Sequence, residues 1–357
     1  MFPMHAAPQK QSFHRIPELD ALRGLAALSV VLFHFSGSNK NLLGWDFRFG
    51  VTGVDIFFMI SGFVIFLTIQ KIHRWQDFVV FRFARLYPAF WCCMLVTAIF
   101  MLVYEPENLS ISQFLANATM LPAYFSEKDL DGSYWTLLVE INFYLWILAV
   151  YMTGTLKRIE DIGFAFLVLI IVFHVFSENY AGLHQIVASK VQLVNHFPLF
   201  YSGILFYQLF KGQKTTKNIL LLIFSLMASC YLHSKGGKSL YYISATKHYF
   251  ILAFYYIVFT LFIYGKLRFL DKMLLIQLGK ISYCLYLIHQ YVGLHLISTF
   301  TEILHFNIYL AIVLALGISI FLAYIVNFFI EIPSNDLIRK WYKNRLGKKL
   351  HAQQTIA

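Results

Sequence analysis

An arginine and a histidine share the first membrane-length apolar stretch of the chain. Arg23 and His34 lie eleven residues apart in LDALRGLAALSVVLFHF. Because an α-helix turns ~100° per residue, eleven steps leave the two side chains only about 20° apart around the axis and roughly 16 Å apart along it. Ionisable groups at this depth are costly in hydrocarbon, so they normally face a protein interior or a water-filled path and mark a functional site.

Two later stretches supply carboxylates. Asp55, in GVDIFFMISGF, falls near the membrane face at which His34 lies. A carboxylate that fixes the tautomer of a histidine makes it a general base, so we expect Asp55 to support His34. Glu140, in SYWTLLVEINFYLW, needs a partner at its depth. We expect it to pair with Arg23 or His34, to orient a substrate hydroxyl, or to hold a contact that the fold needs. Trp135 before it is typical of an aromatic belt and is also a candidate substrate contact.

Two further clusters carry polar side chains. Arg82 and Arg85 are neighbours on one helix face, just before a span that we expect to begin at Pro88. They either anchor the cytoplasmic boundary or bind phosphates as a fork pair, as a coenzyme A thioester would require. In LGKISYCLYLIH, one face presents three side chains that either line a substrate pocket or join helices by hydrogen bonds. These are Ser282, Tyr286 and His289.

The composition places these residues in a membrane protein. Of 357 residues, 59% are hydrophobic and 13% charged, and mean hydropathy is +0.64. We predict an all-α bundle of about ten spans, with 112–125 as an interfacial or re-entrant piece. The spans are 19–36, 50–69, 88–104, 135–152, 163–177, 194–210, 218–233, 247–265, 275–297 and 306–330. The four cysteines lack metal-ligand spacing, and no metal site is assigned.

The net charge of +11 encodes topology. Of 29 lysines and arginines, 20 fall in the tails and loops of one side of the bundle and 7 on the other, while Arg23 and Lys280 lie within spans. This asymmetry predicts a multi-pass membrane protein with both termini cytoplasmic and with attraction to anionic lipids; it argues against nucleic acid as a partner. We expect a membrane domain over 1–333 that ends at a stop signal, Glu331 and Pro333, and a basic cytoplasmic tail over 334–357.

The motifs, taken in order, resemble the acyltransferase family 3 membrane proteins, which transfer acyl groups to sugars. The matching segments are ELDALRGLAALSVVLFH, GVDIFFMISGFVI, FRFARLYP, YWTLLVEINFYL, LGKISYCLYLIH and EIP, between Glu18 and Pro333. Two positions depart from the family pattern. Thr136 stands where the family motif usually has serine, and Tyr291 stands where a proline often follows the histidine. Many members carry a hydrolase-like domain after the last helix, which we do not expect here.

The resemblance implies roles for several of these residues. His34 matches the catalytic histidine and Arg23 its partner, while Arg82 and Arg85 match a pair that contacts the coenzyme. Glu140 matches the glutamate of the family motif. The family uses a cytoplasmic acyl-CoA, most often acetyl-CoA, as donor substrate rather than as a bound cofactor. The acceptor is a hydroxyl of an exported glycan such as lipopolysaccharide O-antigen.

These expectations combine in one mechanism. The coenzyme's phosphates would dock against Arg82, Arg85 and Arg23, and the acyl group would reach His34, which acts as general base or carries the acyl group itself. A transporter or flippase of a lipid-linked or anionic substrate is the alternative from another class. A membrane glycosyltransferase is a third, but it would need an acidic pair for a metal-bound sugar nucleotide, and no such pair is assigned. The acyl group, the acceptor sugar and the oligomeric state stay open.

Overall fold

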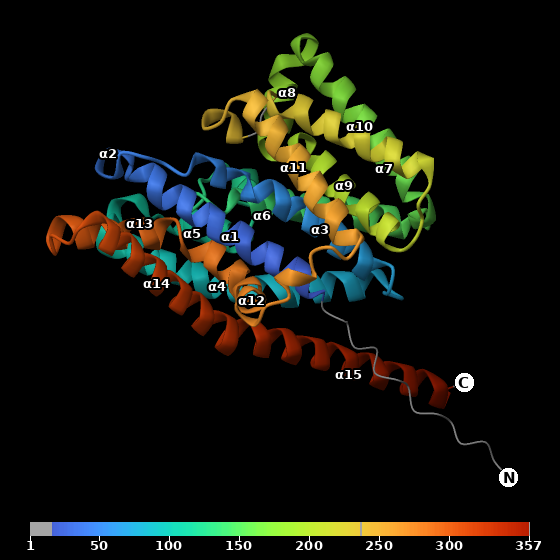
Figure 1. Cartoon of the computed structure of the whole chain (residues 1–357). Coiled ribbons are helices and arrows are strands. Elements are labelled where there is room, and N and C mark those ends of the chain that lie inside the picture. Colours follow the sequence, from blue (N-terminus) through green and yellow to red (C-terminus); the bar gives the residue numbers. More distant parts are fainter. Residues whose placement is uncertain (1–15, 236–237, 357) are drawn as a thin grey trace.

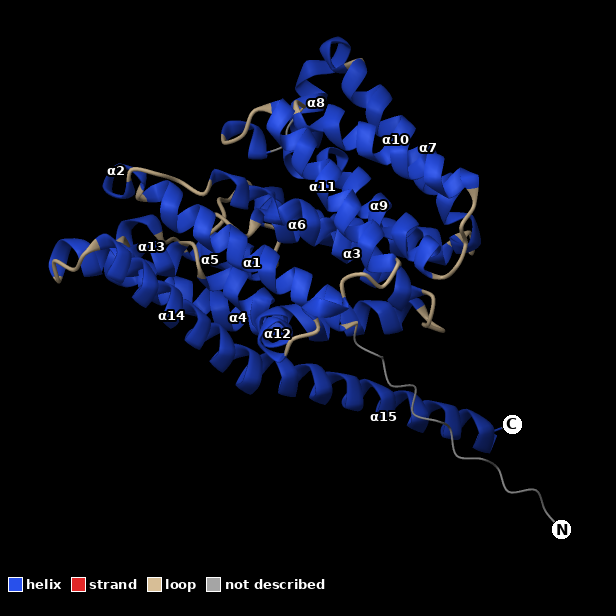
Figure 2. Ribbon diagram, in the orientation of Figure 1, coloured by secondary structure: helices blue, strands red, loops and turns tan. Residues whose placement is uncertain are grey.

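The computed structural model describes residues 16–235 and 238–356, which form helices joined by loops, with no strand among them (Figure 2). The α-helices are α1 (Pro17–Ser38), α2 (Lys40–Leu43), α3 (Gly53–Ile69), α4 (Trp75–Tyr104), α5 (Ile111–Ala118), α6 (Trp135–Met152), α7 (Ile159–Val175), α8 (Ala181–Lys190), α9 (Leu193–Phe210), α10 (Thr216–His233), α11 (Ala245–Ile263), α12 (Met273–Ile288), α13 (Tyr291–Ser298), α14 (Ile308–Val326) and α15 (Ile332–Ile356). Short 3-10 helices cover Arg48–Thr52, Pro106–Asn108, Pro122–Phe125, Leu156–Arg158, Ser177–Tyr180, Lys238–Tyr241 and Arg268–Leu270, and π-helical turns cover Thr299–Ile303 and Asn327–Glu331.

The all-helical fold with several membrane-length helices is confirmed, but the expected count of ten spans is not. Each of the ten apolar stretches contains a helix, but seven helices of the described chain are long and apolar enough to cross a membrane. The count becomes eight if Leu156–Val175 and Ser177–Lys190, bent by 78°, form one broken span. The count of ten and the side of the termini stay predictions. The segment 112–125 forms the short helix α5 and a 3-10 turn.

Helix α9 explains part of the difference in span count. Almost every residue from Leu193 to Leu209 is buried, including Asn195, His196 and Pro198. A helix surrounded by other helices faces protein and not lipid, so it tolerates polar residues that would be costly on a lipid-facing surface. The hydropathy of such a helix is therefore a poor measure of whether it crosses the bilayer.

The helices form two groups joined by a central pair (Figure 1). One group contains α1, α4, α12 and α14, and the other contains α7, α9, α10 and α11. Helix α3 packs on both α1 and α9, while α6 contacts α3, α4 and α9, so these two helices connect the groups. The long helix α15 packs its first part against α4 and then extends away from the bundle, at the lower right of Figure 1.

Glycines allow helices α1 and α12 to approach each other closely. A Cβ atom added to Gly24 would lie 2.7 Å from the backbone nitrogen of Gly279, and one added to Gly279 would lie 2.0 Å from the carbonyl oxygen of Asp20. Helices α3 and α9 approach in the same way, because a Cβ on Gly62 would lie 2.0 Å from the Phe200 carbonyl oxygen. Small residues at these crossings let backbones approach and gain dispersion contacts that lipid cannot replace.

Two helix boundaries differ from the sequence expectation. Pro88 does not begin a span, because α4 runs from Trp75 through Pro88 to Tyr104. Pro333 does not end the last helix either. A π-helical turn over Asn327–Glu331 leads directly into α15, and Pro333 lies in the first turn of α15. Because the helix is continuous from α14 to α15, Pro333 removes one backbone hydrogen bond donor from its interior, and the π-helical turn just before it is where the helix departs from α geometry.

The expected span 275–297 is interrupted beside His289. Helix α12 ends at Ile288, and α13 starts again at Tyr291. The Oδ2 atom of Asp131 accepts a hydrogen bond from the Tyr291 backbone N–H at 2.8 Å. A proline at position 291 would have no N–H to give. Tyr291, which departs from the family pattern, therefore supplies the backbone N–H that donates to Asp131.

We expect Gly279→Val to destabilise the protein strongly. The new side chain would meet the α1 backbone at Asp20, and overpacking of this kind costs about 1–3 kcal/mol or more. Gly317→Val on α14 is the control, because no atom lies within 4 Å of its added Cβ. Thermal unfolding of the detergent-purified proteins measures both. Equal melting temperatures for the two variants would contradict the packing argument.

Candidate active site

A cavity with an empty volume of about 780 Å³ lies between α1, α3, α4, α6 and α12. It contains the three arginines that the sequence analysis assigned to the coenzyme, Arg23, Arg82 and Arg85. Glu140 also lines it, together with Ser61, Thr136, Tyr144, Ser282, Tyr283 and Tyr286. The structure thus brings together residues that lie far apart in the chain. We call it the arginine cavity.

The two arginines of α4 have different surroundings. Arg85 forms an ion pair with Glu331, whose side chain is 1% exposed and also accepts a hydrogen bond from Asn327 Nδ2 at 2.8 Å. The guanidinium of Arg82 lies 5.8 Å from the ring centre of Phe78 and 5.9 Å from that of Tyr144, and its buried Nε has no hydrogen-bond partner. Arg82 therefore has a buried donor that no protein group satisfies.

Glu331 was missed as a site residue, because it was interpreted as a helix stop. Its carboxylate is buried and compensates the charge of Arg85. The sequence did contain a signal, since a glutamate beside the end of a long apolar helix needs a cationic partner. Cys284 also contacts this carboxylate, with its Sγ 3.2 Å from Oε2. Glu331 thus holds one wall of the arginine cavity in place.

Glu140 is bonded within the arginine cavity. It accepts hydrogen bonds from Ser61 Oγ at 2.7 Å and from the hydroxyl of Tyr144. It does not line the neighbouring cavity, in which His34 lies. Of the roles left open for Glu140, a contact that orders α3 and α6 beside the arginines fits this geometry. Direct support of His34 does not.

A second cavity lies next to the first and contains His34; we call it the histidine cavity. Asp55, Trp135, His196, Ser239 and Gln290 also line it. Val54 and Tyr286 line both cavities, so they form a common wall between the arginines and the histidine. The hydroxyl of Tyr286 is held by Thr136 Oγ1 at 3.1 Å and by the Ser133 carbonyl at 3.2 Å.

The closest imidazole to His34 is that of His289. The two ring centres are 5.2 Å apart. His289 is fully buried, and its Nδ1 lies 2.8 Å from the Tyr286 carbonyl oxygen. A carbonyl only accepts, so Nδ1 carries a proton, and Nε2 has no hydrogen-bond partner. Three polar residues were expected on one helix face. Ser282 lines the arginine cavity, Tyr286 forms the common wall, and His289, just after α12, lies beside His34.

Asp55 supports a different histidine from the one expected. Its Oδ2 lies 2.8 Å from Nε2 of His248, a buried residue of α11, and not against His34. The ring of His248 stacks on His233 at 3.8 Å, and Nδ1 of His233 is 3.1 Å from Ser239 Oγ. The expectation was wrong because the short-range pattern could not place α11, which follows almost two hundred residues later.

Trp135 was expected in an aromatic belt or as a substrate contact, and the structure places it beside the second cavity. It is half-buried, lines the histidine cavity, and packs against His196 with ring centres 5.3 Å apart. His196 itself was missed. It lies on the buried helix α9, which brings it beside Phe58 of α3 at 5.2 Å, and a single sequence offers no local sign of that approach.

Asp129 and Asp131 form an acidic pair that the sequence analysis overlooked. Asp131 is fully buried, and its Oδ1 accepts from the N–H and the hydroxyl of Ser133 at 2.7 and 2.6 Å. Its other oxygen holds the N–H of Tyr291. In the described chain, no group of three His, Cys, Asp or Glu side chains could hold a metal ion. Asp131 therefore ties α6 to the α12–α13 break.

These features define an integral membrane protein with a charged chamber beside a histidine-lined one, and known families narrow the class. Residues 16–328 match the family model described as an acyltransferase domain, acyltransferase family 3. The match covers most of the chain, so the protein belongs to this family.

Curated relatives are similar over shorter stretches. Peptidoglycan O-acetyltransferase OatA of Listeria monocytogenes is 30% identical over 152 residues, 36% of this chain and 23% of the relative. Putative peptidoglycan O-acetyltransferase YrhL of Bacillus subtilis is 31% identical over 157 residues, 38% and 24% of the two chains. A putative O-acetyltransferase of Staphylococcus aureus is 28% identical over 172 residues, 42% and 27%. The aligned part spans about a quarter of each relative. No solved structure matches.

We expect the ion pair of Arg85 and Glu331 to show a strong non-additive effect on stability. Glu331→Leu alone leaves a buried cation, and removing one partner of a buried pair typically costs about 3–5 kcal/mol. Replacing both, as in Arg85→Met with Glu331→Leu, should recover most of the loss. Thermal unfolding of the two single variants and the double variant measures the coupling. Additive losses would show that the pair contributes nothing as a pair.

Proposed function

We propose that this protein is a multi-pass O-acyltransferase of the bacterial inner membrane that moves an acetyl group from cytoplasmic acetyl-CoA to a hydroxyl of an exported glycan. The observation that supports this most is the shared wall between the arginine cavity and the histidine cavity. One chamber suits the phosphates of the donor, and the other holds groups that move protons. The relatives named O-acetyltransferases support the reaction type.

The donor binds by its phosphates in this proposal. Arginine guanidinium groups bind phosphate through paired N–H donors, and three arginines line the first cavity. Arg82 has a buried donor available, Arg23 lies on the same helix as His34, and Arg85 is fixed by Glu331. The axial distance of roughly 16 Å from Arg23 to His34 matches the order of length of an extended pantetheine arm. The thioester then reaches the histidine cavity past Tyr286.

His34 carries the chemistry. In direct transfer, the acceptor hydroxyl oxygen bonds to the thioester carbonyl carbon, the carbon–sulfur bond breaks, and the hydroxyl proton passes through the imidazole to the departing thiolate. In the two-step route, one His34 ring nitrogen bonds to the acetyl carbon, the carbon–sulfur bond breaks, and the departing thiolate takes the proton of the other ring nitrogen. The acceptor hydroxyl oxygen then bonds to the acetyl carbon, the nitrogen–carbon bond breaks, and the hydroxyl proton returns to the imidazole. Both routes yield an ester and coenzyme A thiol.

The acceptor is a sugar hydroxyl of a surface glycan. Two relatives are named for peptidoglycan, whereas the family resemblance implies an exported glycan such as lipopolysaccharide O-antigen. Mass analysis of both glycans from cells with and without the gene decides between them. A deletion that leaves ester-linked acetyl unchanged in every surface glycan would contradict an exported acceptor. A transporter or flippase would instead alter the amount of glycan at the surface and not its acetylation.

We expect His34→Ala to lower acetyl transfer by about 10²–10⁴-fold, the range typical of losing a general acid–base group. The assay follows radiolabelled acetyl from acetyl-CoA to glycan in proteoliposomes. His73→Ala, at an exposed position between α3 and α4, is the control and should keep full activity. A normally folded His34→Ala protein with unchanged activity would remove His34 from the mechanism.

We expect Arg82→Ala to raise the KM for acetyl-CoA about 10- to 100-fold with a smaller effect on kcat. The reason is the loss of a charge-assisted hydrogen bond to phosphate, worth about 1.5–3 kcal/mol. Lys343→Ala, an exposed basic residue of α15, is the control for general charge. An Arg82→Ala protein that binds acetyl-CoA normally would place the donor phosphates elsewhere.

A further inference from the structure

A third cavity opens beside His34 at the opposite end of α1 from Arg23. Phe33, His34 and Tyr242 line both this cavity and the histidine cavity, so the two adjoin at the reactive imidazole. The other wall residues used below are Lys40, Asp46, Arg48 and Tyr241. The mechanism above gives the donor a chamber of its own but assigns no residues to the acceptor. We call these four residues, with Tyr242, the outer cluster.

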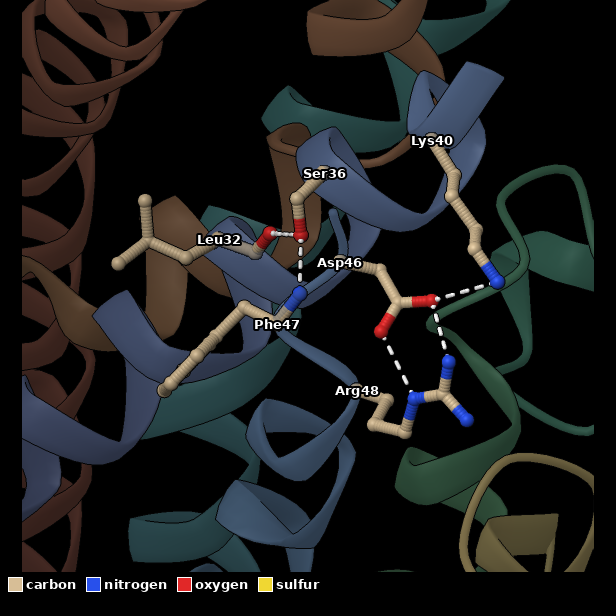
Figure 3. Close-up of polar contacts among 6 residues, drawn as sticks. All are labelled: Leu32, Ser36, Lys40, Asp46, Phe47 and Arg48. Carbon is tan, nitrogen blue, oxygen red and sulfur yellow. Dashed lines mark hydrogen bonds and ion pairs between the residues drawn. The ribbon is translucent and has the colours of Figure 1, made fainter. Parts of the chain in front are cut away.

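The charged part of the outer cluster is an ordered network. Asp46 accepts two parallel hydrogen bonds from Arg48, from Nε at 2.8 Å and from a terminal nitrogen at 2.9 Å, and Lys40 Nζ lies 3.3 Å away (Figure 3). The Arg48 guanidinium holds the pKa of Asp46 below its ordinary value, so the carboxylate is ionised at neutral pH. The bidentate geometry fixes the plane of the guanidinium.

The loop that carries the network is fastened to α1. Ser36 Oγ accepts a hydrogen bond from the Phe47 N–H at 2.8 Å and donates one to the Leu32 carbonyl at 2.6 Å (Figure 3). Gly44 makes the turn after α2 with a φ of 76°, a conformation that glycine adopts without strain. His34 lies on the same helix, two residues before Ser36. Asp46 and Arg48 are therefore held at a set position relative to His34.

The network has donors to spare and one net positive charge. A guanidinium has five N–H groups and an ammonium has three. The contacts to Asp46 use two N–H groups of the Arg48 guanidinium and one of the Lys40 ammonium. Lys40 and Arg48 are 53% and 42% exposed, so the remaining donors are open to a ligand. Two cations against one carboxylate leave an unbalanced charge of +1 at the mouth of the cavity.

Aromatic rings form the opposite part of the outer cluster. Tyr241 is 85% exposed and Tyr242 is 49% exposed. The ring of Tyr242 packs edge-on against Phe33 with centres 4.8 Å apart, and Phe33 lies 4.7 Å from His34 in the same way. Amphipathic rings that present an apolar face and a hydroxyl beside charged donors can cover the apolar face of a sugar while the charged groups bind its oxygens.

We propose that the outer cluster is the acceptor subsite and that it binds a sugar carrying one negatively charged group, a carboxylate or a phosphate. The oxyanion binds the free donors of Arg48 and Lys40, the ring lies against Tyr241 and Tyr242, and a neighbouring hydroxyl points to His34. The catalytic part of this inference rests on the proposed function, but the binding of an anionic glycan does not.

The test measures binding to the purified full-length protein in detergent by calorimetry. The probes are an oligosaccharide ending in glucuronic acid, the same oligosaccharide ending in glucose, and one ending in glycerol phosphate. We expect a charged probe to bind at least 10-fold more tightly than the neutral one. Which charged probe binds better identifies the carboxylate or phosphate source. Equal binding of all three probes would overturn the proposal.

Variants locate the binding site. Arg48→Ala should weaken charged-probe binding at least 10-fold, and Arg48→Lys should restore only part, because lysine lacks the planar fork. Lys40→Ala provides a second variant should Arg48→Ala reduce the melting temperature. Lys128→Ala, an exposed lysine outside the cluster, should bind as the unaltered protein does. Unchanged binding in well-folded Arg48→Ala and Lys40→Ala would overturn the assignment.

Kinetics separates this inference from the proposed function. In an active protein, Arg48→Ala should raise the KM for the charged acceptor and leave the KM for acetyl-CoA unchanged. Charged-probe binding without any acetyl transfer would contradict the proposed function and leave the subsite standing. Acetyl transfer with no preference for a charged acceptor would contradict the subsite and leave the function standing.

Discussion

The contact between α1 and α12 is the constraint on which the rest of the site depends. Gly24 and Gly279 let the two backbones approach so closely that neither position accepts a side chain. That approach brings the helix of Arg23 and His34 against the helix of Ser282 and Tyr286. Both cavities are built around this helix pair. Helices α3, α4 and α6 complete the walls of the arginine cavity, and α3, α6 and α9 contribute to the walls of the histidine cavity.

Each buried carboxylate has its own polar partner, on one side of the interior or the other. Glu331 balances Arg85 on the arginine side, and Asp55 is bonded to His248 on the histidine side. Both oxygens of Asp131 accept hydrogen bonds. One accepts from the N–H and the hydroxyl of Ser133, and the other accepts from the N–H of Tyr291 at the α12–α13 break. In the proposed mechanism His34 therefore works beside a second imidazole, His289, and not beside a carboxylate that would hold its proton.

How far the sequence could predict this site depends on how local each feature is. The shared face of Arg23 and His34 follows from helix geometry alone, and the need of Glu140 for a polar partner followed from its cost in the membrane. The pairing of Asp55 with His248 could not be predicted, because the partner lies on a helix whose position is set by the whole bundle. The helix boundaries expected at Pro88 and Pro333 were wrong. A proline often marks a helix end in a sequence, but tertiary packing can hold a helix together across it.

The wall shared by the two cavities has a consequence for the membrane itself. A protein that passes a thioester arm across a bilayer must not also conduct protons or ions down the same route. Val54 and Tyr286 are the side chains that both chambers have in common, and the hydroxyl of Tyr286 is tied to α6 through Thr136 and Ser133. In the proposed mechanism, the permeability barrier of the route therefore belongs at this pair, and Tyr286 would close the route to ions as well as separate the two cavities.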